Sequence, residues 1–313
     1  MTMADFLETE LSNCLRMQVS DEGLSSWQFT ATSATSDWLA GVDVSIHVES
    51  PVWTQMVAHV ASLRLKPDTI LDLAAGPGEP GCSLAARFPA ATVTVSDSVP
   101  AMTSAASKRV RALGLSDRVK VEQMDMRDLS SVATASHDLV TNCLGLHLIS
   151  PEDLVATLSQ IARVLKPGGH LIAVVWDDAP LLEASLLAME DITCRPWPKA
   201  KMRCGGDAMD SMWANAHLHL ARGHNSIHPM PPTNLGTMDD GPTAKWWVEG
   251  PFSLLGGPKG PLGQFAPDQL EMLQESFRVR FQSQGLVNTR RELEYVQSRR
   301  LLAVVKPFQI KCV

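Results

Sequence analysis

Between residues 69 and 176, short runs of apolar and β-branched residues alternate with longer segments of helical composition. Helices are expected at residues 81–88, 101–113 and 151–165. This alternation is the pattern of a parallel sheet with crossover helices, so the sequence predicts an α/β fold with a doubly wound, mostly parallel sheet. The predicted strands lie at residues 69–73, 92–95, 119–123, 139–141 and 171–176.

The third of these helices has clear signals at both ends. Ser150 stands at the N-cap position, Pro151 at the first helical position, and Glu152 in the first turn, where the helix dipole favours an acid. Pro167 and Gly168 follow the last turn, where they stop a helix and turn the chain. We therefore expect this helix to begin at Pro151 and the next strand to follow a turn.

The character of the sequence changes on both sides of this region and predicts four parts. Residues 1–62 are expected to form an N-terminal helical lid, and residues 63–177 the ligand-binding core. Residues 178–262, rich in Trp, His, Pro and Gly, are predicted to be an inserted substrate cap. Residues 263–313 are predicted to complete the core with a C-terminal helix and a β-hairpin.

The two strands of that hairpin are predicted at residues 289–295 and 300–306, joined by a short turn. Added to the five strands of the core, this antiparallel hairpin would make a seven-stranded sheet. Oligomeric state is not indicated by the sequence.

Composition excludes several function classes. The 27 Lys and Arg against 34 Asp and Glu give a formal net charge of −7, which argues against a nucleic-acid partner. No apolar run reaches the roughly 18 residues that span a bilayer, and the acidic start lacks the basic region of a secretory signal. We therefore expect a cytoplasmic protein with no membrane partner. The six cysteines have no C-x-x-C spacing, so no metal site is predicted from them.

A glycine-rich turn follows the first predicted strand. Gly76, Gly78 and Gly81 match G-x-G-x-x-G, a pattern also found in dinucleotide sites, so a nicotinamide oxidoreductase has to be weighed. In such sites the first glycine usually follows the strand directly, whereas here residues 72–75 intervene. Acids stand at the ends of three successive strands, which favours a ligand with an amine, a ribose and an adenine amino group. These acids are Asp72, Asp97 and Asp125.

The segment from Asp72 to Gly78 resembles the D-x-G-x-G-x-G loop of the class I S-adenosylmethionine-dependent methyltransferases, small-molecule branch, with Ala74 in place of the first glycine. The resemblance covers roughly residues 60–176. It implies that the loop wraps the methionine part of S-adenosyl-L-methionine, that Asp97 binds the ribose, and that Asp125 reads the adenine. The cofactor-binding residues implied are Asp72, Ala74, Gly76, Gly78, Asp97, Ser98, Asp125, Met126 and Asn142.

The methyl acceptor is less constrained. His147 follows the fourth strand, where the family often has two histidines, and is the candidate base; Leu148 departs from that pair. Trp53, Trp176 and Arg195 are candidates for substrate binding, the tryptophans because aromatic faces attract cations. The histidines between residues 217 and 228 lack a recognisable zinc pattern, so no metal is expected, although the sequence leaves metal binding there open.

These observations predict a methyltransferase that moves a methyl group to a small molecule by in-line displacement. The acceptor is a thioether acid giving a sulfonium, as in dimethylsulfoniopropionate synthesis, or an amine. One alternative is O-methylation of a phenol or carboxylate with His147 as base. Another is a catalytically silent scaffold that binds S-adenosylmethionine without turnover.

Overall fold

The structure is a computed structural model that describes residues 42–146, 149, 151–177, 180–193, 216, 218–229, 233–237, 267–295 and 298–307. The chain divides into two compact units, each of which is described by itself. One unit holds a seven-stranded sheet with its covering helices. The described part of the other holds two helices and a two-stranded sheet.

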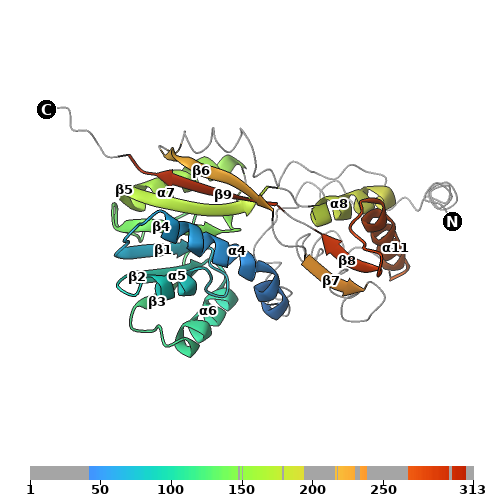
Figure 1. The fold of residues 1–313 in the computed structure, drawn as a ribbon, viewed down its shortest axis with the longest axis horizontal. Coiled ribbons are helices and arrows are strands. Elements are labelled where there is room, and N and C mark those ends of the chain that lie inside the picture. The colour runs from blue at the N-terminus through green and yellow to red at the C-terminus, as the bar shows by residue number, and fades with distance from the viewer. Residues whose placement is uncertain are drawn as a thin grey trace. The chain divides into compact units, whose positions relative to one another are not determined.

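The strand order in the large sheet is β3-β2-β1-β4-β5-β9-β6 (Figure 1). Strands β1 to β5 are parallel, and β9 is antiparallel to both of its neighbours, so β6 runs in the same direction as β1 to β5. The predicted mostly parallel, seven-stranded sheet is therefore confirmed. The strands are β1 (Thr69–Leu73), β2 (Thr92–Asp97), β3 (Val119–Gln123), β4 (His137–Cys143), β5 (Leu165–Trp176), β6 (His219–Pro229) and β9 (Ser298–Val305).

The predicted C-terminal hairpin is wrong in its pairing. Strand β8 (Glu292–Tyr295) pairs with β7 (Thr233–Thr237) in the separate two-stranded sheet, and β9 lies between β5 and β6. In β9 four successive apolar residues, 301–304, are all buried, as suits a strand covered on both faces. In β8 the half-buried Glu292 and Glu294 alternate with the buried Leu293, which suits a sheet with one solvated face.

Helices cover both faces of the large sheet, which confirms the doubly wound architecture (Figure 1). Apolar side chains of α4 (Val42–Ser62), α5 (Gly81–Arg87) and α6 (Pro100–Ala112) pack into one core cluster against one face. Side chains of α7 (Pro151–Val164) pack into a second cluster against the other face. The predicted helix start at Pro151 is confirmed.

Strand β5 begins earlier than predicted. It follows α7 directly at Leu165, and the segment from Lys166 to Gly169, predicted to be a turn, belongs to the strand. Gly168 takes a φ of 79° and donates its N–H to the carbonyl of Lys306 at 2.8 Å, while Gly169 accepts from Lys306 at 2.9 Å. Pairing with the far end of the chain therefore turns a local turn signal into strand.

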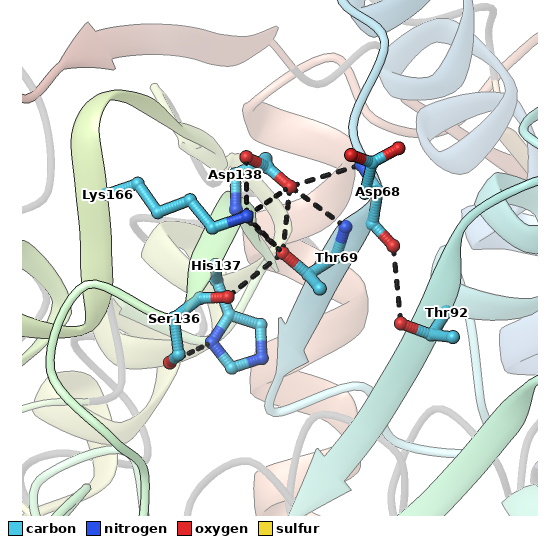
Figure 2. Close-up of polar contacts among 7 residues, drawn as sticks. All are labelled: Asp68, Thr69, Thr92, Ser136, His137, Asp138 and Lys166. Atoms are coloured by element: carbon cyan, nitrogen blue, oxygen red, sulfur yellow. Dashed lines mark hydrogen bonds and ion pairs between the residues drawn. The ribbon is translucent and has the colours of Figure 1, made fainter.

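A polar cluster joins the amino ends of β1, β4 and β5 (Figure 2). The Asp138 carboxylate accepts from Lys166 Nζ at 2.9 Å, and from the Thr69 hydroxyl at 2.8 Å and its N–H at 3.0 Å. Burial opposes ionisation, but these hydrogen bonds outweigh it and lower the pKa of Asp138. Open α/β sheets bind ligands at the opposite, carboxyl edge, so this cluster serves to hold the three strands together.

In the second unit, α8 (Pro180–Thr193) packs against α11 (Pro267–Ser283). Arg280 of α11 forms an ion pair with Asp191 of α8, and the Ser276 hydroxyl donates to the carbonyl of Ala188 at 3.2 Å. A helix was predicted close to the bounds of α11. Among the helices of the described residues, none combines the length and the apolar composition needed to cross a bilayer.

Candidate functional site

The glycine-rich loop leaves the carboxyl end of β1 and enters α5. Ala74, Gly76 and Gly78 all have positive φ, at 53°, 52° and 102°. Such values are favourable for glycine and strained for alanine, so Ala74 holds its conformation against a cost of about 1 kcal/mol. A Cβ placed on Gly76 would meet no atom within 4 Å, so the backbone at Gly76 borders open space. The loop therefore fits a ligand that approaches its backbone closely.

Asp72 is fully buried beneath this loop. Its Oδ2 accepts from the N–H of Gly81 at 2.7 Å, and its Oδ1 from the hydroxyl of Thr141 at 2.6 Å. The carboxylate thus ties the start of α5 to β4. The sequence associated Asp72 with a cationic group of the ligand; in the structure both of its oxygens bind the protein.

Asp97 ends β2 and is 9% exposed. Its Oδ2 accepts from the N–H of Gly76 at 2.9 Å, and its Oδ1 from the N–H of Val99 at 2.9 Å. Burial raises the pKa of Asp97, and the two backbone hydrogen bonds oppose that shift. A carboxylate has about four acceptor sites, so Asp97 can hold the loop and still accept from a ligand. The neighbouring Ser98 is exposed.

Asp125 follows β3 and forms a forked ion pair with Arg127. Arg127 Nη2 lies 2.7 Å from Asp125 Oδ2, and Nε lies 3.1 Å and 3.0 Å from the two oxygens. These hydrogen bonds lower the pKa of Asp125, against a smaller effect of burial. The Asp125 side chain is 37% exposed, so it borders solvent at the edge where the sequence expects the adenine.

Asn142 organises the loop after β4. Its Oδ1 accepts from the N–H groups of Gly145 at 3.1 Å and Leu146 at 2.8 Å, and its Nδ2 donates to the carbonyl of Leu73 at 3.0 Å. Nδ2 also lies 3.5 Å from the sulfur of the buried Met126. These contacts bring the chain that follows β1, β3 and β4 together, so Asn142 acts as a positioning residue of the loops.

The remaining candidates are placed only in part. Trp53 is buried in the core on α4, where it is 8% exposed. Trp176 is the last residue of β5, at the carboxyl edge of the sheet. His147 and Arg195 lie outside the described residues.

The sequence did not reveal an ion pair that fixes the glycine-rich loop. Glu79 is buried, and its Oε1 accepts from Arg109 Nε at 3.0 Å and Nη2 at 2.6 Å, while its Oε2 accepts from the N–H of Ser83 at 3.1 Å. This contact joins the loop to α6 across 30 residues of sequence. No local pattern could have indicated it.

The buried carboxyl of Asp72 predicts a pH dependence of stability. Burial raises its pKa from 3.8 to about 7, so between about pH 4 and pH 7 the folded protein binds more protons at Asp72 than the unfolded chain does. The contribution of Asp72 to the free energy of unfolding should therefore fall as pH rises through this window. D72N should remove that fall, which amounts to a few kcal/mol.

The measurement is urea unfolding of both proteins at steps between pH 4 and pH 8. The pKa of Asp97 is raised and that of His137 is lowered in both proteins, so the prediction concerns the difference between the two proteins at each pH. If the free energies of unfolding of the two proteins changed with pH in parallel, the raised pKa of Asp72 would be contradicted.

Comparison with known proteins agrees with this geometry. Residues 70–169 match the family model described as Methyltransferase domain. The chain is 31% identical to a demethylmenaquinone methyltransferase of Thermus thermophilus over 128 residues, 41% of this chain and 56% of that protein. It is 31% identical to a ribosomal RNA small subunit methyltransferase G of a Synechococcus species over 135 residues, 41% of this chain and 52% of that protein. The chain thus spans about half the length of the curated relatives it matches.

Among solved structures, a protein named as a methyltransferase from Bacillus halodurans shares the fold, with a TM-score of 0.52 and 16% identity. The match covers 80% of this chain and 98% of that one. The family model covers the region of the glycine-rich loop and the strand ends around it. Residues 70–169 are therefore similar to a methyltransferase domain, and the fold is shared with a solved structure named as a methyltransferase.

Proposed function

We propose that the chain is an S-adenosylmethionine-dependent methyltransferase that acts on a small molecule. The observation that carries the proposal is the pairing of Gly76 and Asp97: a backbone that borders open space is hydrogen-bonded to a carboxylate with acceptor sites to spare. That arrangement suits a ligand in which a ribose is joined to an amino-acid part that lies along the loop.

The cofactor would lie along the carboxyl edge of the sheet. Asp97 would hold the ribose, Asp125 and Met126 the adenine, and the loop from Ala74 to Gly78 the methionine part. When bound, S-adenosylmethionine supplies a methyl group on a sulfonium. The contribution of this chain would be to align the acceptor with that methyl group and to exclude water.

A small acceptor is favoured over RNA by the charge of the chain. One relative is named for demethylmenaquinone and another for ribosomal RNA, so the relatives support either class. The net charge of −7 gives the chain no overall attraction for a phosphate backbone. The acceptor would be a thioether acid, an amine, or a phenol or carboxylate; in the last case His147 is the candidate base.

Calorimetry on the full chain tests the cofactor assignment. S-adenosylhomocysteine, S-adenosylmethionine and NAD are titrated separately into the protein. We expect both adenosyl ligands to bind and NAD not to bind. Binding of NAD without either adenosyl ligand would identify the glycine-rich loop as a dinucleotide site and defeat the proposal.

A further inference from the structure

The carboxyl edge of the sheet has two halves. The residues proposed to hold the adenine, ribose and methionine parts follow β3, β2 and β1 in that spatial order. Strands β4 and β5 lie next to β1 on its other side. A methyl acceptor must approach the methyl group on the sulfonium, which lies between the ribose and the amino-acid part of the cofactor. The ends of β4 and β5, on the side of β1 away from the strands proposed to hold the adenine and the ribose, are left for that acceptor.

An ion pair marks this second half of the edge. Asp177 is the first residue after β5, and Arg300 lies in β9 opposite Val175, the penultimate residue of β5. Arg300 Nε donates to Asp177 Oδ1 at 3.0 Å, and Nη2 lies 2.9 Å from the same oxygen. The two side chains are only 19% and 14% exposed, so the pair is held in a mostly buried position.

The geometry of the pair leaves one carboxylate oxygen for a ligand. Both Arg300 nitrogens engage Oδ1, and within the described part of the chain no hydrogen bond reaches Oδ2. An ionised carboxylate can only accept hydrogen bonds. Arg300 thus orients Asp177 at the end of β5 as an acceptor for an N–H or O–H group.

We propose that Asp177 takes the proton of the methyl acceptor, and that the acceptor is therefore a protic nucleophile, an amine or a hydroxyl compound. This inference rests on the proposed function. Arg300 is the positioning residue for Asp177. Asp177, directly after β5, thus joins His147 as a candidate base.

The proton balance follows from the chemistry of displacement. The lone pair of the acceptor forms the new bond to the methyl carbon, and the carbon–sulfur bond breaks with its electrons remaining on sulfur. The acceptor atom gains positive charge as it bonds to the methyl carbon, which makes its proton more acidic, and this proton passes to Asp177 Oδ2. The products are the methylated acceptor, S-adenosylhomocysteine and a protonated Asp177, which returns its proton to solvent.

The test uses the full chain, methyl-labelled S-adenosylmethionine and two acceptor panels. One panel is protic and holds primary and secondary amines and phenols; the other is aprotic and holds thioethers and tertiary amines. The variants are D177N and R300K. The matched control is D191N, which alters another mostly buried Asp–Arg pair with exposures of 19% and 21%.

We expect transfer to a protic acceptor and a fall in kcat of at least about 100-fold in D177N, the usual effect of losing a proton acceptor. We expect kcat of the parent protein to fall at acid pH and expect D177N to lack that fall. R300K should give an intermediate fall, and D191N should keep kcat within about twofold. Melting temperatures and S-adenosylhomocysteine affinities, both expected to be preserved, separate these effects from a loss of folding.

Three results would overturn the proposal: transfer to aprotic acceptors alone, a D177N kcat within about threefold of the parent with the same pH profile, or no transfer to either panel while S-adenosylhomocysteine binds. Absence of S-adenosylhomocysteine binding is a different failure, because it defeats the proposed function itself.

Discussion

Replacing Asp97 with alanine is expected to weaken S-adenosylhomocysteine binding by at least about 100-fold. The substitution would remove the carboxylate proposed to accept from both ribose hydroxyls, and hydrogen bonds to charged groups contribute about 1.5–3 kcal/mol each. It would also release the N–H of Gly76, so the glycine-rich loop would lose its tie to β2. Both effects act in the same direction.

The measurement is isothermal titration calorimetry with S-adenosylhomocysteine. The matched control is D128A, because Asp128 is exposed and accepts from Ser130, whose N–H lies 3.0 Å away. Adenosine and 2′,3′-dideoxyadenosine as competitors separate ribose recognition from loop support: the parent protein should prefer adenosine, and D97A should not. An affinity of D97A within about threefold of the parent would refute the role given to Asp97.

Replacing Gly81 with alanine is expected to lower the free energy of unfolding by about 2–3 kcal/mol. Gly81 is the first residue of α5, where helix propensity alone favours alanine by about 1 kcal/mol. A Cβ there would lie 2.5 Å from Val95 Cγ2 and 2.8 Å from Asp72 Oδ2. The clash and the displaced buried hydrogen bond should therefore reverse the sign that propensity predicts.

Urea unfolding measures this difference, with G114A as the control. Gly114, unlike Gly81, has a positive φ, at 65°, and a Cβ there would meet no atom within 4 Å, so G114A reports backbone strain without a clash. G81A should lose more stability than G114A. A G81A protein as stable as the parent would show that Asp72 and Val95 can move away without cost, and that α5 is not fixed as described.

The parts of the fold that depend on local patterns could be predicted from the sequence. Strands β1 and β3 have the predicted bounds because each apolar run is closed by polar residues and turns. The parts that depend on distant pairing could not. The start of β5 at Leu165 comes from pairing with His137, 28 residues away, and the place of β9 between β5 and β6 comes from pairings more than 60 residues apart.

The same division holds for the candidate site. Acids at strand ends could be located because the ends of parallel strands meet at one edge, and the structure places Asp72, Asp97 and Asp125 there. Their partners could not be read from the sequence, since Thr141 lies 69 residues from Asp72. Burial of Asp72 makes it a tie between the loop and β4, a role that only the packing reveals.

The central claim is that this chain transfers the methyl group of S-adenosylmethionine to a small molecule. Its most direct test is to incubate the full chain with methyl-labelled S-adenosylmethionine and a panel of amines, phenols, carboxylates, thiols and thioethers, with D97A in parallel. The account predicts a labelled product and S-adenosylhomocysteine with the parent protein, and neither with D97A. Tight S-adenosylhomocysteine binding with no labelled product from any acceptor would contradict it and identify the chain as a cofactor-binding scaffold.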